Sequence, residues 1–290
     1  MYRNRLAAQI FLLCLALLAL AGVLPAAAQA PLPVATPDIG VPFVEEFDYY
    51  DPARWTKANG WANPMPPFWC GWRDDHTELD PLPHWYPSTG LMRIRLDDIP
   101  CPEWCSGRPW ASDELRSNHF YGYGTYRVRL RAARGSGLVT AFFIYTGPYD
   151  GNPHHELTLE VLGRDPATIW ITTFAGDDVG RSVSIPLGFD AADAFNTYRI
   201  DWSQDAVRVF ANGRLLYTDD GSNGPLPSVP GRLMMSLWPC TGRTSWCGDF
   251  IYPGEPIYAD FDFASYSDRA PQSSYLPLVL SRLDTIKALP

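Results

Sequence analysis

The segment HHELTLEVLG, which starts at His154, places two carboxylates on one side of a predicted strand. Successive side chains of a strand alternate between its faces, so Glu156, Thr158 and Glu160 share one face and apolar residues occupy the other. Two carboxylic groups acting as a pair can cleave a glycosidic bond, one as the nucleophile and the other as the acid and base. The spacing alone is a weak signal, because solvated strand faces often carry such a pair. The surrounding sequence must therefore decide between a catalytic pair and an ordinary solvated strand face.

The chain around this segment reads as a series of short strands separated by turns. No stretch after residue 30 keeps a 3.6-residue hydrophobic period over the length of a helix. Asn212-Gly213, between two such strands, is the strongest hairpin signal in the chain. The pattern predicts an all-β protein, an antiparallel β-sandwich whose curved sheets form a concave groove. Strands are expected at residues 123–130, 138–145, 168–174, 197–202, 206–211, 214–218, 232–238 and 257–266.

Residues 1–30 predict a secretory signal peptide. Arg3 and Arg5 precede an apolar run from Ile10 to about Leu24, and a small-x-small cleavage motif ends at Ala30. The apolar run is short for a bilayer, which makes an uncleaved membrane anchor the weaker alternative. We therefore expect a secreted, extracellular protein.

The rest of the chain divides into three parts. Residues 31–40 are an extended linker with several prolines, and residues 41–268 carry the β-sandwich. The tail, residues 269–290, contains the apolar segment YLPLVLS, which could dock as an edge strand or retain the protein at a surface. A weakly ordered tail is the favoured interpretation, because chain ends without a docking site are usually disordered.

The composition limits the possible partners. Loss of the signal peptide would remove two of the 23 basic residues and none of the 32 acidic ones, which changes the formal net charge from −9 to −11. An acidic, aromatic-rich chain is a poor match for nucleic acid or an anionic membrane. Neutral carbohydrate polymers fit better, since sugar rings stack on tryptophan and tyrosine. We expect a monomer that binds such a polymer.

Five cysteines remain after the signal peptide, and export favours disulfides. Cys240 and Cys247 flank one loop and are the first expected pair. Cys70 is expected to pair with Cys101 or Cys105, which leaves one thiol over. A zinc site is not expected, because no paired CxxC motif or nearby pair of histidines supports it.

In this setting the glutamate segment resembles the signature of glycoside hydrolase family 16, which includes the bacterial lichenases that cut mixed-linkage β-1,3-1,4-glucans. The family strand has the form Glu-Ile-Asp-Ile-Glu-Phe-Leu-Gly, and the corresponding segment here is ELTLEVLG. The resemblance implies a jelly-roll β-sandwich of the concanavalin A-like type, with a substrate cleft across its concave sheet. Further matches cover most of the mature chain: ELRS from Glu114, YGYGTY from Tyr121, AFFIYTGP from Ala141, LGFDA from Leu187, NTYRIDW from Asn196, NG at Asn212, MMSLW from Met234 and YADFD from Tyr258.

The resemblance also implies an activity, that of an endo-β-glucanase acting on β-1,3-1,4- or β-1,3-glucan by a retaining double displacement. Glu156 would be the nucleophile and Glu160 the general acid and base. The family's aspartate between them is Thr158 here, which can donate a hydrogen bond but cannot ionise. Two alternatives therefore stay open: a glycan-binding module whose catalysis has decayed, and a transglycosylase.

The same resemblance implies a set of substrate-binding positions. Three of them depart from the family's residues, because Thr172 and Phe174 replace an asparagine and a tyrosine, and Ser236 replaces another asparagine. Phe143 and Tyr145 share one face of a strand, so both are expected in the cleft, with the core as the alternative. The full set is Asn63, Glu114, Arg116, Phe143, Tyr145, Thr172, Phe174, Ser236 and Trp238.

Lichenase-like members of the family also bind a structural calcium ion, largely through backbone carbonyls and one aspartate. Asp262 and Gly90 match two of those ligand positions. One carboxylate plus carbonyls can hold calcium at extracellular concentrations, although Asp262 could equally be a solvated residue near the end of a strand. A structural calcium is thus one interpretation, and no cofactor is expected to be required for the chemistry.

Overall fold

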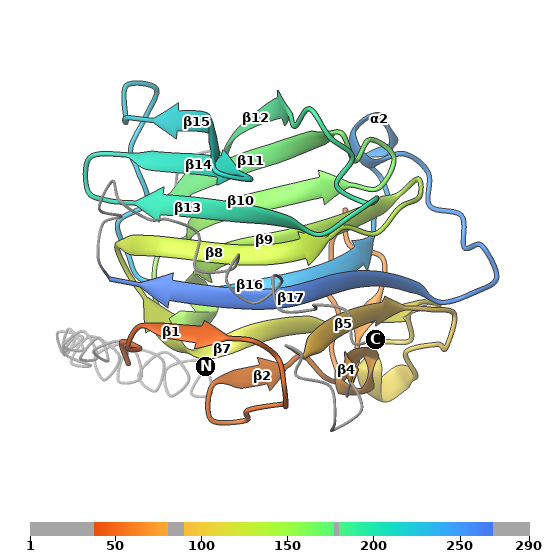
Figure 1. Cartoon of the computed structure of the whole chain (residues 1–290). Coiled ribbons are helices and arrows are strands. Elements are labelled where there is room, and N and C mark those ends of the chain that lie inside the picture. Colours follow the sequence, from red (N-terminus) through yellow and green to blue (C-terminus); the bar gives the residue numbers. More distant parts are fainter. Residues whose placement is uncertain (1–37, 81–89, 177–179, 269–290) are drawn as a thin grey trace, which may run out of the picture. The chain divides into compact units, whose positions relative to one another are not determined.

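A computed structural model of the chain describes residues 38–80, 90–176 and 180–268. Nearly all regular structure in these residues is β-strand, and the strands form two large antiparallel sheets stacked as layers (Figure 1). The expected all-β sandwich is confirmed. Among the described residues, no helix has the length and apolar character needed to cross a membrane.

Each sheet brings together strands that lie far apart in the sequence. Across the described part of the first sheet the order is β15 (Arg214–Asp219), β14 (Val207–Ala211), β13 (Asn196–Trp202), β8 (Gly124–Arg131), β17 (Ile257–Ser267), β5 (Leu91–Leu96) and β4 (Thr77–Asp80), while β1 (Phe43–Glu45) also pairs with β17. The second sheet runs β12 (Arg181–Pro186), β11 (Thr168–Ala175), β10 (His155–Leu162), β9 (Leu138–Thr146), β16 (Gly231–Pro239), β7 (Glu114–Tyr121) and β2 (Trp55–Lys57).

Short elements complete the described structure. Two short strands, β3 (Gly71–Trp72) and β6 (Ala111–Ser112), pair in parallel. The helical pieces each span only three or four residues, which agrees with the absence of a helical period in the sequence. They are η1 (Asp74–His76), η2 (Glu103–Cys105), η3 (Pro148–Asp150) and α2 (Thr244–Cys247).

The core lies between the two sheets and explains the alternation in β10. Leu157, Leu159 and Val161 are buried, at 2%, 4% and 3% exposure. Glu156 and Glu160 are partly exposed on the opposite face of the same strand. Burial of the three apolar side chains therefore fixes which way the glutamates point, because a slip of one residue would exchange the two faces.

Each strand expected from the sequence is present, with ends that differ by no more than one residue. The hairpin between β14 and β15 is also confirmed: Asn212 and Gly213 have φ angles of 49° and 80°, the two positive values that a type I′ turn requires. The sequence patterns did not single out β1 to β7 or β12. In β12 only Val183 and Ile185 form a half-buried apolar side, and β7 mixes polar and apolar residues without a clear period.

The cysteine pairing differs in part from expectation. Cys240 and Cys247 form the expected disulfide, with 6.3 Å between their Cα atoms. The expectation for Cys70 was wrong: it is a buried free thiol, and Cys101 pairs with Cys105 at a Cα–Cα distance of 5.0 Å. The turn of η2 brings the Cα–Cα distance of these two cysteines into the normal range for a disulfide, so they pair with each other within one turn.

Parts of the expected domain organisation lie outside the described residues. This applies to the signal peptide at 1–30 and to the tail at 269–290. The end of the expected linker is attached to the sandwich, since the amide of Gly40 donates to the carbonyl of Phe120 at 2.9 Å and the amide of Phe120 donates to the carbonyl of Asp38 at 2.9 Å.

Candidate active site

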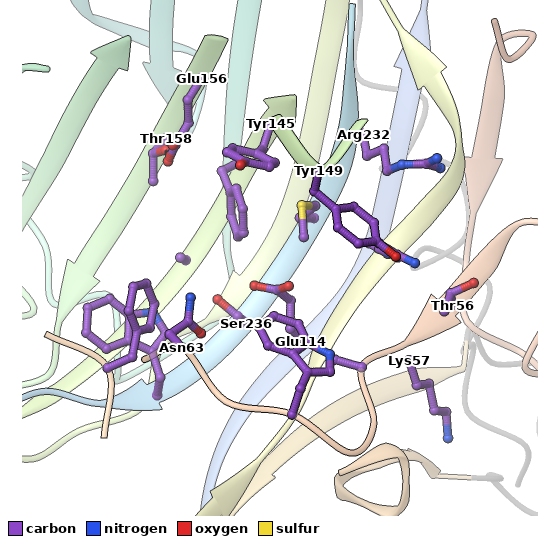
Figure 2. A pocket seen from close by; sticks show the side chains of 18 of the residues that line it. Thr56, Lys57, Asn63, Glu114, Tyr145, Tyr149, Glu156, Thr158, Arg232 and Ser236 are labelled. Carbon is purple, nitrogen blue, oxygen red and sulfur yellow. Dashed lines mark hydrogen bonds between the residues drawn. The ribbon is translucent and has the colours of Figure 1, made fainter. Parts of the chain in front are cut away.

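A cleft of about 720 Å³ lies on the face of the second sheet that is turned away from the core. Figure 2 shows Glu156 and Thr158 together on one strand, Tyr145 on the neighbouring strand, and Glu114 and Ser236 elsewhere in the same cleft. The lining comprises Thr56, Lys57, Ala58, Asn59, Trp61, Asn63, Phe68, Glu114, Arg116, Ala141, Phe143, Tyr145, Tyr149, Asp150, His154, Glu156, Thr158, Glu160, Arg232, Met234, Ser236 and Trp238.

The register of the antiparallel strands decides which side chains meet on the cleft floor. Residues that are directly paired in neighbouring strands point to the same face, so they form rows across the sheet. Three such rows contain Glu156, Thr158 and Glu160. Read from β11 through β10 and β9 to β16, the rows are Phe174–Glu156–Tyr145–Arg232, Thr172–Thr158–Phe143–Met234 and Trp170–Glu160–Ala141–Ser236.

Glu160 lies in an environment that favours its protonated form. Burial, and then the charge of Glu156, raises its pKa from 4.5 to about 8. The small Ala141 beside it on β9 offers no side-chain hydrogen bond that would stabilise the anion. At neutral pH Glu160 therefore keeps its proton and can donate it to a leaving group.

Glu156 is held through both of its carboxylate oxygens. The hydroxyl of Thr158 donates a hydrogen bond to Oε1. The ring nitrogen Nε2 of His154 lies 2.8 Å from Oε2. These contacts fix the orientation of the carboxylate and leave further lone pairs on each oxygen.

A second charged pair, Glu114 and Arg116, reaches the cleft from β7. The register with β16 sets Glu114 beside Ser236 and Arg116 beside Met234. Burial raises the pKa of Glu114 to about 7, although Arg116 lowers it, and the charge of Glu156 raises it further. Near neutral pH Glu114 can thus donate or accept hydrogen bonds, as recognition of sugar hydroxyls requires.

Aromatic side chains line one part of the cleft. Trp238 is almost fully buried and its ring lies 4.3 Å from the ring of Phe68. Trp61 is 42% exposed and so offers a free ring face. The expected residue Asn63 is also in the lining, where its side-chain oxygen accepts a hydrogen bond of 2.9 Å from the indole of Trp72.

The structure decides between cleft and core for the two aromatic residues of β9. Phe143 and Tyr145 are partly exposed and line the cleft, while the alternating Phe142 and Ile144 are buried between the sheets. The expectation that the pair shares one face is confirmed, and the core alternative is wrong.

Two of the expected substrate-binding residues do not line the cleft. The hydroxyl oxygens of Thr172 and Ser182 lie 2.8 Å apart, so Thr172 is bonded to the next strand. Phe174 is covered by His154, whose ring stacks on it at a centroid distance of 4.3 Å and an interplanar angle of 20°. Both residues sit in the rows of Glu156 and Thr158, but as supports for the lining.

Several lining residues had not been identified as part of a site by the sequence patterns, among them Tyr149, Asp150, His154 and Arg232. The loop that carries η3 and leads into β10 brings Tyr149, Asp150 and His154 to the cleft, and β16 contributes Arg232. Asp150 accepts a bond of 3.3 Å from the guanidinium of Arg232, and the exposed ring of Tyr149 lies 5.8 Å from the guanidinium carbon of Arg116. The signal in the sequence that could have pointed to these residues was the turn-rich segment just before the glutamate strand.

The residues matched to a calcium site fit the ion only in part. Gly90 precedes β5, and its backbone lies against the carbonyl of Phe47. Asp262 lies in β17, the partner strand of β5, but its carboxylate accepts a hydrogen bond from Arg129. Among the described residues no group of three acidic, histidine or cysteine side chains could hold a metal. Calcium at Asp262 would compete with Arg129 for its carboxylate.

Sequence comparisons show relatives over most of the chain. The model of glycosyl hydrolases family 16 matches residues 85–252. The β-glucanase of Bacillus subtilis (strain 168) is 34% identical over 236 residues, which covers 81% of this chain and 90% of that protein. The β-glucanase of Brevibacillus brevis is 34% identical over 231 residues, 79% of this chain and 83% of that protein.

Solved structures agree with these relatives. The β-glucanase of Bacillus licheniformis matches with a TM-score of 0.70 and 34% identity, covering 79% of this chain and 99% of that one. A prokaryotic lichenase from a mouse hindgut metagenome matches with a TM-score of 0.69 and 31% identity, covering 79% of this chain and all of that one, at 100%. The chain therefore belongs to glycosyl hydrolases family 16.

Proposed function

We propose that this protein is a retaining endo-β-glucanase that hydrolyses β-1,3-1,4- or β-1,3-glucan. The observation that carries the proposal is the pair of glutamates in one cleft: Glu160 has its pKa raised to about 8, in part by the charge of Glu156. Two carboxylic groups with different protonation states can serve as acid and nucleophile. Relatives named β-glucanase, 34% identical over most of the chain, support glucan as the substrate class.

The form of the cleft supports attack within a polymer chain. A sugar polymer needs stacking surfaces and polar groups, and the lining supplies both through Trp61, Phe143 and Trp238 beside Glu114 and Arg116. A neutral glucan also avoids the repulsion that an anionic polymer would meet in this acidic chain.

In the first step of the proposed reaction, a carboxylate oxygen of Glu156 attacks the anomeric carbon of one glucosyl unit. The bond from that carbon to the glycosidic oxygen breaks, and Glu160 gives its proton to the departing oxygen. The products are a glycosyl ester on Glu156, a shortened chain with a new hydroxyl, and an ionised Glu160.

In the second step, water replaces the departed chain. The ionised Glu160 removes a proton from the water, whose oxygen attacks the anomeric carbon. The ester bond breaks, Glu156 is again a carboxylate and Glu160 again carries a proton. Two displacements at the same carbon leave its configuration unchanged.

The experiment is an assay of the mature protein for new reducing ends from barley β-glucan and laminarin. Glu156→Gln and Glu160→Gln should each reduce the rate by several orders of magnitude, because each removes a group that acts on the reacting bond. Unchanged activity in both variants would refute the assignment. The ratio of rates on the two polymers would identify the preferred linkage.

Thr158 supports a second candidate function, that of a glycan-binding module with little catalysis. A threonine between the glutamates cannot ionise, so the charge of the site differs from the family pattern. This candidate predicts oligosaccharide binding without turnover and no gain from Thr158→Asp. A large gain of hydrolysis in that variant would instead identify an enzyme weakened at one position.

Transglycosylation would use the same covalent intermediate, with a sugar hydroxyl in place of water. It shares Glu156 and Glu160 with hydrolysis and differs in what reaches the anomeric carbon in the second step. Products longer than the donor oligosaccharide, separated by chromatography, would identify it.

Export and a monomeric state are further parts of the proposal. The basic and apolar pattern of residues 1–30 supports export, and an N-terminal sequence of the protein from culture medium that begins after Ala30 would test it. Size-exclusion chromatography with light scattering would test the monomer.

A structural calcium held by Asp262 and Gly90 remains a proposal, with Arg129 as its competitor.

A further inference from the structure

The environment of Glu156 contains a histidine that the proposed reaction has not yet used. Nε2 of His154 lies 2.8 Å from Oε2 of Glu156, and the hydroxyl of Thr158 donates to Oε1. Each carboxylate oxygen therefore has its own donor. The two donors differ, because the threonine is always neutral while an imidazole can carry a positive charge.

His154 is held in place from three sides. Its ring stacks on Phe174 at 4.3 Å and meets the ring of Tyr145 edge-on at 5.4 Å. Its carbonyl accepts a hydrogen bond of 2.8 Å from the amide of Gly176, which fixes the backbone where the chain enters β10. A ring fixed in this way loses little further freedom when it holds a carboxylate, so the contact is preorganised.

The neighbouring His155 does not share this contact. It is buried, and its Nδ1 accepts a hydrogen bond of 3.2 Å from the amide of Ser228. Of the two adjacent histidines, His154 is therefore the one that contacts Glu156.

We propose that His154 is a positioning residue of the reaction, which holds Glu156 in its attacking orientation where the strand lacks an aspartate. This proposal rests on the proposed glucanase function. Nε2–H of His154 donates to Oε2 while the hydroxyl of Thr158 donates to Oε1, so the two contacts together fix the plane of the carboxylate.

The consequence is a specific pattern in the kinetics. Loss of the contact at 2.8 Å should misplace the carboxylate that attacks, so kcat should fall by more than KM changes.

The experiment compares substitutions that separate hydrogen bonding from ring packing. His154→Phe keeps a ring to stack on Phe174 but removes the donor, so kcat should fall by at least about tenfold while KM changes less than about threefold. His154→Gln keeps an N–H donor without the ring, and it should recover most of kcat.

Two controls make the result specific. Thr158→Val removes the other donor to the same carboxylate, so it should also lower kcat with little change in KM. His119→Gln, a surface substitution at a histidine paired with Asp38, should match the parent in kcat and KM. The melting temperature of each variant separates loss of fold from loss of positioning.

The outcomes distinguish this proposal from the function on which it rests. If the parent hydrolyses glucan and His154→Phe has the same kcat, His154 has no positioning role and the glucanase assignment stands. If the parent hydrolyses no glucan while it binds oligosaccharides, both are wrong. A His154→Gln variant as slow as His154→Phe would also overturn the proposal, since an N–H donor should restore the orientation of Glu156.

Discussion

Replacement of Glu160 by glutamine tests whether the cleft holds this group at a cost in stability. Burial and the charge of Glu156 raise the pKa of Glu160 in the folded protein from 4.5 to about 8. Below pH 4.5 the group is protonated in both the folded and the unfolded chain. As the pH rises through about 8 the folded protein loses stability, because the unfolded chain releases the proton more readily. Glutamine cannot ionise, so the variant should escape this loss.

The size of the effect follows from the pKa shift. A change from 4.5 to about 8, at about 1.4 kcal/mol per pKa unit, sets an upper limit of about 5 kcal/mol. The Glu160 side chain is partly exposed to the water in the cleft, and screening reduces the effect to about 2 kcal/mol. For a domain of this size, about 2 kcal/mol corresponds to a rise in Tm of roughly 4 to 8 °C.

The assay is differential scanning calorimetry of the parent and Glu160→Gln at intervals from pH 4 to pH 9. The difference in Tm should be near zero at pH 4, grow with pH and reach its full value above pH 8. Glu46→Gln, at an exposed glutamate, is the matched control and should show no such growth. A difference for Glu160→Gln that stays constant with pH would refute the reasoning, because a packing effect does not depend on protonation.

Three further substitutions test other parts of the structure. Joint Cys240→Ser and Cys247→Ser substitution should lower the free energy of unfolding by about 2 to 3 kcal/mol, and an unchanged Tm without reductant would contradict the disulfide. Leu159→Ala should lose about 2 to 5 kcal/mol in urea titration, because the side chain is 4% exposed, and a loss well under 1 kcal/mol would contradict its place in the core. Millimolar calcium, compared with EDTA, should raise the Tm of Arg129→Gln more than that of the parent, because the substitution releases Asp262 from its ion pair. A larger rise in the parent would contradict competition between calcium and Arg129.

The strands were predictable because their signal is local. Alternation of apolar and polar residues, as in Leu157, Leu159 and Val161 of β10, reports directly which face is buried. Asn212-Gly213 likewise fixes a hairpin through its own backbone preferences. The edge strand β12 was not recognised, since its alternation rests on only two half-buried apolar residues, Val183 and Ile185.

The candidate site was predictable in part for the same reason. Glu156, Thr158 and Glu160 share one strand, so their common face follows from spacing. Their partners come from other strands and loops. Thr172 shows the limit: it pairs with Thr158 in the sheet, yet its hydroxyl is bonded to Ser182 and lies outside the cleft lining.

By itself, the sequence determined the β-sandwich class and the face on which two glutamates lie, because both depend on a two-residue period within single strands. Only the tertiary structure decided that Cys70 is a buried free thiol, that His154 holds Glu156, and that Glu160 has a pKa of about 8. The local turn at Cys101 and Cys105 leaves Cys70 without a disulfide partner, stacking on Phe174 of the neighbouring strand holds the ring of His154, and packing of neighbouring strands desolvates Glu160. The spacing of these residues along the chain does not encode these conformations.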